Sequence, residues 1–221
     1  MKKRRLRVIS IILAGLGAFL IFLSIYPIAE YEYVSRKRFP KLVSPITSGE
    51  RYQILLTPVK DFSNINNWSA EYNVPEKSAD ESPEKYLLSV PKLGIKDALV
   101  FEGGEDLAKS LIQYPGTARP GQPGDAVIFG HSILPIFFNP KNYMSIFSTL
   151  PKLNIGDEIF VNIGQVMYKY KISEMFEVEP DNIDILDQRL SESYISLVTC
   201  VPPGHPLKPR RLVVRAKLAE I

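Results

Sequence analysis

The stretch DEIFVNIGQVMYKYKISEMFEV, from Asp157 to Val178, alternates apolar and polar residues on both sides of Gly164. Alternation with a period of two is typical of strands that bury one face, and a glycine between two such runs is typical of a hairpin turn. This stretch therefore predicts a β-hairpin in a domain built mostly from strands.

Further strand-like runs occur on both sides of this hairpin, and turns rich in Pro and Gly separate them: YLLSVPKLGIKDALV (86–100, two strands about PKLG), AVIFGHS (126–132), YISLVTC (194–200) and RRLVVRAKL (210–218). LAKSLIQYPG (107–116) is predicted to be a short helix, and YMSIFSTLPKL (143–153) a second short helix or a turn. Seven or eight short strands with few helices favour a small closed barrel or a sandwich.

The N-terminus is a basic tail followed by a long apolar run. Five Lys and Arg residues lie between Lys2 and Arg7, and an uncharged stretch extends from Val8 to Ala29. As an α-helix this stretch would measure about 33 Å, enough to cross a hydrocarbon core of about 30 Å. It is longer than the apolar core of a cleaved signal peptide, about 7 to 15 residues, and no clear cleavage site follows it. We therefore predict an uncleaved signal anchor, with a cleaved signal peptide as the alternative.

Basic residues flank this anchor on both sides. Five precede it and four follow it closely, at positions 36, 37, 38 and 41, so the positive-inside rule gives a slight preference for a cytoplasmic N-terminus. The chain then divides into a cytoplasmic tail (1–7), a transmembrane anchor (8–29), a stalk or approach segment (30–85) and an extracellular domain (86–221). These boundaries predict a single-pass protein of the cell membrane.

The charge distribution excludes nucleic acid as a partner. The net charge is +3, but residues 1–41 hold nine Lys and Arg against two Glu, so the rest of the chain is net negative. A nucleic-acid surface would need a basic patch or stripe in the folded domain.

The candidate catalytic residues are few, because the chain has one cysteine and two histidines. Cys200 ends a strand-like run before a proline pair, where its thiol could act as a nucleophile. A lone cysteine is equally often a small buried apolar residue, and this alternative stays open. His131 follows an apolar strand at Gly130 and is either a structural residue or a general base. His205, in the proline-rich loop after Cys200, suits contact with substrate or solvent better than action on the thiol.

The last strand-like run carries several arginines. In a strand, Arg211, Val213 and Arg215 share one face, so Arg210 and Arg211 point in opposite directions. Both arginines could be ordinary surface charges. Alternatively, one of them lies beside the thiol, lowers its pKa and stabilises an oxyanion.

Together these pieces resemble the sortases, the membrane-anchored cysteine transpeptidases of bacterial cell surfaces. The resemblance runs from Tyr86 to Leu218 and rests on five segments in a characteristic order behind a signal anchor: LSVPKLGIKDALV, YPGTARPGQPGD, VIFGHS, LVTC and RRLVVRA. It implies a mostly β fold, a closed eight-stranded β-barrel with a few short helices, preceded by one transmembrane helix.

The resemblance also implies roles for individual residues. Cys200 would be the nucleophile, His131 the general acid and base, and Arg211 the group that stabilises the oxyanion or the substrate carbonyl. Arg210 is the alternative arginine, because an alignment shifted by one position would select it. Thr199, next to the nucleophile, and His205 are expected to bind substrate.

The implied reaction is cleavage of an LPxTG-like sorting signal and transfer of the acyl group to an amine of peptidoglycan or of a pilin subunit. The partners would be surface proteins with C-terminal sorting signals, together with the amine acceptor. The reaction requires no metal or organic cofactor. Calcium activation stays open, although Glu174, Glu177 and Glu179 are too scattered in the sequence to be assigned as ligands.

The sequence does not assign a subclass. The segment ILPIFFNPKNYMSIF (133–147) is long and aromatic, and KDFSNINNW (60–68) loosely resembles the lids of pilin-building sortases without their Asp-Pro-aromatic form. A class D or class E-like sortase is the suggestion left open. Two other functions also stay open, namely an exported cysteine endopeptidase that only hydrolyses and a noncatalytic membrane-tethered binding module.

Overall fold

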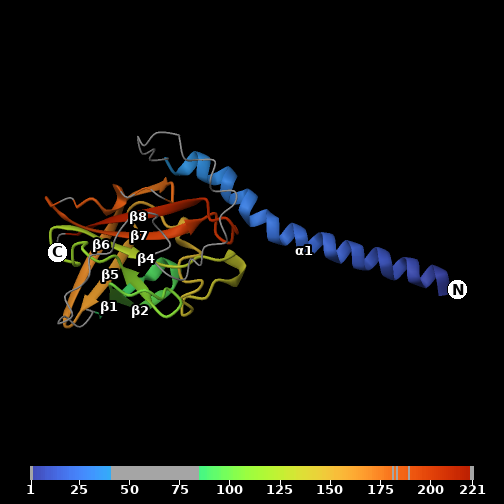
Figure 1. The fold of residues 1–221 in the computed structure, drawn as a ribbon, viewed down its shortest axis with the longest axis horizontal. Helices are drawn as coiled ribbons and strands as arrows, with labels where there is room; N and C mark the ends of the chain where they lie inside the picture. The colour runs from blue at the N-terminus through green and yellow to red at the C-terminus, as the bar shows by residue number, and fades with distance from the viewer. Residues whose placement is uncertain (1, 41–84, 181, 183, 189, 220–221) are drawn as a thin grey trace.

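A computed structural model of the chain describes residues 2–40, 85–180, 182, 184–188 and 190–219. These residues form a closed eight-stranded β-barrel and one long N-terminal helix that projects from it (Figure 1). The barrel confirms the fold that the strand count and the resemblance predict. Most of the predicted stalk (41–84), with the candidate lid at 60–68, lies outside the described residues.

The strands follow one another around the barrel in the order β1-β2-β3-β4-β7-β8-β6-β5. Their bounds are β1 (Lys85–Val90), β2 (Ile95–Glu102), β3 (Leu111–Gln113), β4 (Gly124–Phe129), β5 (Glu158–Ile163), β6 (Val166–Val178), β7 (Ser193–Val201) and β8 (Arg210–Leu218). Short 3-10 helices lie between them: η3 (Pro91–Leu93), η4 (Pro135–Phe137), η5 (Leu150–Lys152) and η6 (Asp184–Leu186). β7 pairs with β4 in parallel and with β8 antiparallel, so segments far apart in the sequence form one wall.

The hairpin predicted about Gly164 joins β5 and β6 and is confirmed. Ile163 pairs with Val166, which leaves a two-residue turn, and Gly164 has a positive φ of 61°. Two-residue hairpin turns require this left-handed conformation, which glycine adopts without a steric penalty.

Two hydrophobic clusters lie on the two faces of the β4-β7-β8 wall. The larger one fills the barrel and includes Ile195 and Leu197 of β7. The smaller one lies on the outer face and includes the intervening positions, Val198 and Cys200. Because side chains alternate along a strand, Cys200 points away from the barrel interior.

The short helix predicted at 107–116 is wrong, because this segment is a turn followed by β3. β3 spans three residues and is held by parallel pairing with β2 and antiparallel pairing with β4. A strand this short shows no period-two pattern, so only its neighbours in the barrel define it. The segment 143–153 forms successive turns and η5, in agreement with the alternative of a turn.

The N-terminal helix α1 (Lys2–Arg38) contains the predicted membrane anchor. By length and composition it could cross a membrane, and its apolar window is not buried by the rest of the protein. The helix continues past Ala29 to Arg38, so the first residues of the predicted stalk are helical.

The C-terminal end of α1 docks on the barrel. Tyr31, Ser35 and Phe39 recur at intervals of four, a helical spacing that places them on one face, and all three are buried. The Tyr31 hydroxyl donates a hydrogen bond of 2.6 Å to the carboxylate of Glu177 in β6. Arg38 donates to two backbone carbonyls in the segment before β5. These contacts hold the barrel in a defined position against the end of the helix.

Candidate active site

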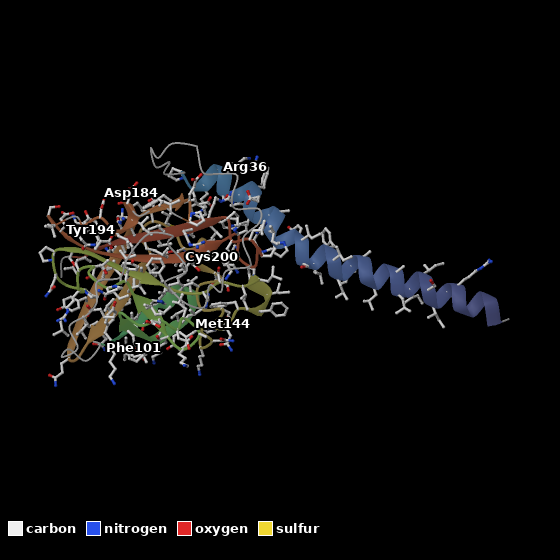
Figure 2. The ribbon with its side chains drawn as sticks, viewed as in Figure 1. Arg36, Phe101, Met144, Asp184, Tyr194 and Cys200 are labelled. Atoms are coloured by element: carbon white, nitrogen blue, oxygen red, sulfur yellow. The ribbon has the colours of Figure 1, made fainter. Side chains whose placement is uncertain are left out.

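Cys200 lies near the end of β7, on the side of the barrel from which α1 extends (Figure 2). Its side chain is 1% exposed. Burial raises the pKa of the thiol above its ordinary value, and the positive charges of Arg211 and Lys208 partly oppose this shift. The resting thiol is therefore protonated at neutral pH.

Arg211 is the cross-strand partner of Cys200 in the β7-β8 ladder. Directly opposite residues share a face of the sheet, so the guanidinium and the thiol project to the same side. Arg211 is 2% exposed, and its Nη1 donates a hydrogen bond of 3.1 Å to the carbonyl of Lys208. Burial lowers the pKa of Arg211, and the charge that Cys200 can carry raises it. Each group thus stabilises the ionised form of the other.

Arg210 pairs with Val201 and therefore points to the opposite face. Its Nε lies 2.8 Å from a carboxylate oxygen of Glu177, and its Nη2 forms an ion pair with Glu32 of α1. Arg210 joins the barrel to the helix, whereas Arg211 lies beside the thiol. Of the two candidate arginines, the geometry favours Arg211.

His131 follows β4, the neighbour of β7 on the side opposite to β8. The parallel register pairs Phe129 with Val198, and His131 and Cys200 each lie two residues further along. His131 is 3% exposed. The barrel therefore brings His131, Cys200 and Arg211 to the same end of three adjacent strands.

Gly130, the residue before His131, packs tightly against two buried side chains. A Cβ at position 130 would be 2.4 Å from a ring carbon of Phe147 and 2.7 Å from a methyl carbon of Leu111. Both side chains are fully buried, so neither can move away easily. Close packing therefore requires glycine at this position.

Two reciprocal hydrogen bonds join the backbones next to the histidine and the cysteine. The hydroxyl of Thr199 donates to the carbonyl of Gly130 at 2.8 Å, and the hydroxyl of Ser132 donates to the carbonyl of Cys200 at 2.6 Å. The structure thus places the Thr199 side chain in the wall, fully buried, rather than in an open groove. Ser132 was not identified as a site residue from the sequence. The one feature of the sequence that could have indicated it is its position directly after His131.

His205 is half-buried in the loop between β7 and β8. The ring Nδ1 of His205 accepts a hydrogen bond of 3.2 Å from the backbone N–H of Leu207, and the backbone N–H of His205 donates to the carbonyl of Pro202 at 3.0 Å. Through these two bonds, His205 stabilises the loop that begins just after Cys200.

Two of the three glutamates weighed as calcium ligands form ion pairs. Glu177 contacts Arg210, and Glu174 lies 3.5 Å from Nη1 of Arg215. Within the described ranges, no group of three or more His, Cys, Asp and Glu side chains could hold a metal ion.

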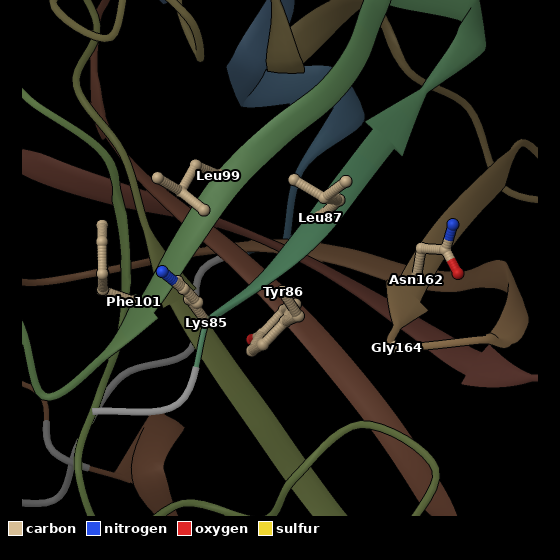
Figure 3. Close-up of a pocket in the computed structure, with 7 residues that line it drawn as sticks. All are labelled: Lys85, Tyr86, Leu87, Leu99, Phe101, Asn162 and Gly164. Carbon is tan, nitrogen blue, oxygen red and sulfur yellow. The ribbon is translucent and has the colours of Figure 1, made fainter. Parts of the chain in front are cut away.

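A pocket on the outside of β1, β2 and β5 is separate from this site (Figure 3). It is lined by Lys85, Tyr86, Leu87, Leu99, Phe101, Asn162 and Gly164. The lining includes neither Cys200 nor His131, so this pocket is not part of the site that the thiol and the imidazole form.

The Sortase domain profile matches residues 88–219, well over half of the chain. The chain belongs to the sortase family. Sortase A of Staphylococcus aureus is 26% identical over 144 residues, which cover 58% of this chain and 66% of that protein. Sortase A of Streptococcus agalactiae is 29% identical over 164 residues, which cover 72% of this chain and 62% of that protein. The matched part of this sortase thus spans less than two thirds of either relative.

Solved sortase structures share the fold. The Sortase D5 transpeptidase of Clostridium perfringens matches with a TM-score of 0.52 and 28% identity, over 61% of this chain and 78% of that one. The pilus-related Sortase C of Group B Streptococcus matches with a TM-score of 0.54 and 29% identity, over 64% of this chain and 70% of that one. Because sortases of different classes match to a similar degree, the subclass of this sortase stays unassigned.

Proposed function

We propose that this sortase is a cysteine transpeptidase in which Cys200 is the nucleophile, His131 the general acid and base, and Arg211 the stabiliser of the oxyanion. The observation that carries the proposal is the register pair of Cys200 and Arg211, with His131 at the same level of the neighbouring strand. A thiol used only for packing would need neither a buried arginine nor a buried histidine beside it, because burying polar groups costs free energy.

In the first step, the thiol loses its proton to His131, and Sγ attacks the scissile carbonyl carbon of the substrate. The carbonyl oxygen becomes an oxyanion, which the guanidinium of Arg211 stabilises with fixed N–H donors. When the intermediate collapses, the C–N bond breaks and the departing amine takes the proton from His131. A thioester between Cys200 and the substrate acyl group remains.

In the second step, an acceptor amine attacks the thioester carbonyl. His131 removes a proton from the amine, and the Cys200 sulfur leaves as a thiolate that is protonated again. The products are a new amide bond and the resting enzyme. Because an amine replaces an amine, peptide bond energy is conserved, and no metal or organic cofactor takes part.

The side chains that pack around Cys200 are apolar and buried, and they include Leu107, Ile112, Phe129 and Val198. We propose an LPxTG-like sorting signal as substrate, because the chain belongs to the sortase family and has Cys200, His131 and Arg211 at one end of three adjacent strands. The substrates would be surface proteins that carry this signal, and the acceptor would be an amine of peptidoglycan or of a pilin subunit.

We further propose that α1 anchors the protein in the cell membrane as a single span, with the N-terminus in the cytoplasm and the barrel outside. The helix is long and apolar enough to cross, and basic residues precede it.

Product analysis with a labelled LPxTG-like peptide tests the reaction. The full chain in lipid nanodiscs should yield a ligated product when a glycine-based amine is present, and Cys200→Ala should yield none. His131→Ala should lower turnover by about 100-fold or more, which is the typical contribution of a general acid or base to the rate. The matched variant His205→Ala should keep turnover within about threefold of the wild type.

Product found only as the free acid at high acceptor concentration would identify an endopeptidase instead. A Cys200→Ala protein that restores full function in a deletion strain would identify a binding module. Thermal unfolding of each variant shows whether inactivity comes from chemistry or from loss of the fold.

A further inference from the structure

Two loops at the active-site end of the barrel expose large apolar side chains. In the segment 133–144, Ile136 and Phe137 are both 62% exposed, and in the segment 202–209, Leu207 is 75% exposed. We name these two segments the active-site loops, because the first follows His131 and the second begins two residues after Cys200. Large apolar side chains that gather on one end of a domain indicate an interaction surface.

The active-site loops pack on each other and so form one surface. A Cβ at Gly204 would lie 2.6 Å from Cγ of Leu134 and 2.8 Å from its backbone nitrogen, and Gly204 has a φ of +80°. The first loop is also tied to the second through the hydrogen bond from Ser132 to the carbonyl of Cys200.

The contacts of α1 place this surface close to the membrane boundary. Ala29 is the last residue of the uncharged run, and Glu32, which lies about 4.5 Å further along a helix, forms the ion pair with Arg210. The headgroup layer of a bilayer is about 5 to 7 Å deep on each side. Arg210 directly follows the second active-site loop, so this loop ends at the level of the headgroups.

The picture of the whole chain agrees with this placement. In Figure 1 the yellow loop after β4 lies on the side of the barrel from which α1 extends toward the N-terminus. The first active-site loop, which carries Ile136 and Phe137, is therefore on the same side as the membrane-spanning part of α1.

The charge of the active-site loops suits a phospholipid surface. The sequence contains no Asp or Glu from residue 126 to residue 156 or from residue 193 to residue 219. The loops themselves carry Lys141 and Lys208. Apolar residues beside lysines are the composition that binds the interface of a bilayer with anionic lipids.

We propose that the active-site loops insert Ile136, Phe137 and Leu207 into the headgroup region of the bilayer that α1 spans. The inference rests on the proposed membrane anchoring, and it adds a second membrane contact beside the helix. The end of the barrel that holds Cys200 then lies at the membrane surface.

Tryptophan quenching by brominated phospholipids tests the contact without any use of activity. The full chain, with its single tryptophan replaced by Trp68→Phe, is reconstituted in nanodiscs that contain anionic lipid. Phe137→Trp and Leu207→Trp report on the loops, and Phe19→Trp reports on the anchor. Met167→Trp is the matched control, because Met167 is also 62% exposed but lies at the opposite end of the barrel.

Emission at positions 137 and 207 should fall by roughly half on exchange into brominated lipid, as expected for side chains about 5 to 10 Å inside the interface. Emission at position 167 should not change. Equal quenching at positions 137 and 167 would overturn the inference. If position 19 is still quenched in that case, the proposed membrane anchoring stands. Absence of quenching at 19 would overturn the anchoring and the inference with it. A blue-shifted but unquenched signal at 137 would show a protein surface, such as a second copy of the chain, in place of lipid.

Discussion

Ser132 donates a hydrogen bond of 2.6 Å to the backbone carbonyl of Cys200. Ser132 follows His131, so this bond ties the histidine segment to the backbone of Cys200. In return, the hydroxyl of Thr199, which precedes Cys200, donates to the carbonyl of Gly130, which precedes His131. Neither hydroxyl needs to touch substrate. Together they couple the ends of β4 and β7, so the distance between the imidazole and the thiol depends on both.

Ser132→Ala and Thr199→Val should each lower kcat/KM by roughly 10-fold to 100-fold, because a displacement of about 1 Å between reacting groups has this effect. Most of the loss should be in kcat, since the reacting groups and not the substrate contacts are displaced. Ser193→Ala is the control, because Ser193 is a buried, hydrogen-bonded hydroxyl at the other end of β7. Steady-state kinetics with unchanged turnover in Ser132→Ala would contradict a positioning role.

Arg211→Ala should lower turnover by about 100-fold or more, as removal of an oxyanion donor does. Arg210→Ala should leave turnover within a few fold but lower the free energy of unfolding by about 1 to 3 kcal/mol, because the buried carboxylate of Glu177 loses a partner. Kinetics and urea unfolding of both variants measure the two effects. The reverse order of turnover would move the catalytic role to Arg210.

Alkylation of Cys200 by iodoacetamide should require alkaline pH. Because burial raises the pKa of the thiol, the midpoint of the rate against pH should lie above its ordinary value of 9.0. Arg211→Ala should move the midpoint further up, since the positive charge of Arg211 lowers the pKa of Cys200. Mass spectrometry follows the reaction at this single cysteine. A midpoint that moves down in Arg211→Ala would argue against contact between the two groups.

The raised pKa of Cys200 should also affect stability. The folded thiol keeps its proton at pH values where the unfolded thiol has lost it, so this contribution is complete below the ordinary thiol pKa of 9.0 and is lost as pH rises through the folded pKa. The free energy of unfolding should therefore fall less steeply with alkaline pH in Cys200→Ala than in the wild type. Burial also raises the pKa values of Tyr86 and Tyr170. Both tyrosines are present in the variant and in the wild type, so their effect on stability at alkaline pH cancels in the difference between the two proteins. Parallel curves would contradict the shift.

A buried ion pair lies on the same face of the β4-β7-β8 wall as the site, four residues along the strands from it. Nε of Arg215 lies 2.9 Å from Asp125, whose side chain is fully buried and also accepts a hydrogen bond from Ser196. Asp125→Ala should lower the free energy of unfolding by about 3 to 5 kcal/mol, because it leaves a buried charge uncompensated. Glu192→Gln breaks an exposed ion pair with Lys217 and should have almost no effect. Urea unfolding that shows equal losses would contradict this account.

Features that depend on neighbours in the sequence could be predicted from it. The hairpin about Gly164 and the apolar run of α1 were predicted correctly, because a turn residue between alternating runs and a long uncharged segment are local signals. β3 and the docked end of α1 could not be predicted in the same way. Each is defined by contacts with other segments: β3 pairs with β2 and β4, and α1 is held by bonds such as that from Tyr31 to Glu177.

The sequence by itself determined which chemical groups are present: one thiol, two imidazoles, and two adjacent arginines that must point in opposite directions along a strand. The tertiary structure decided which arginine lies beside the thiol and which histidine is at its level. The reason is register, since moving β8 by one residue against β7 would exchange the faces of Arg210 and Arg211. Closure of the barrel, which places β4 beside β7, brings His131 to Cys200.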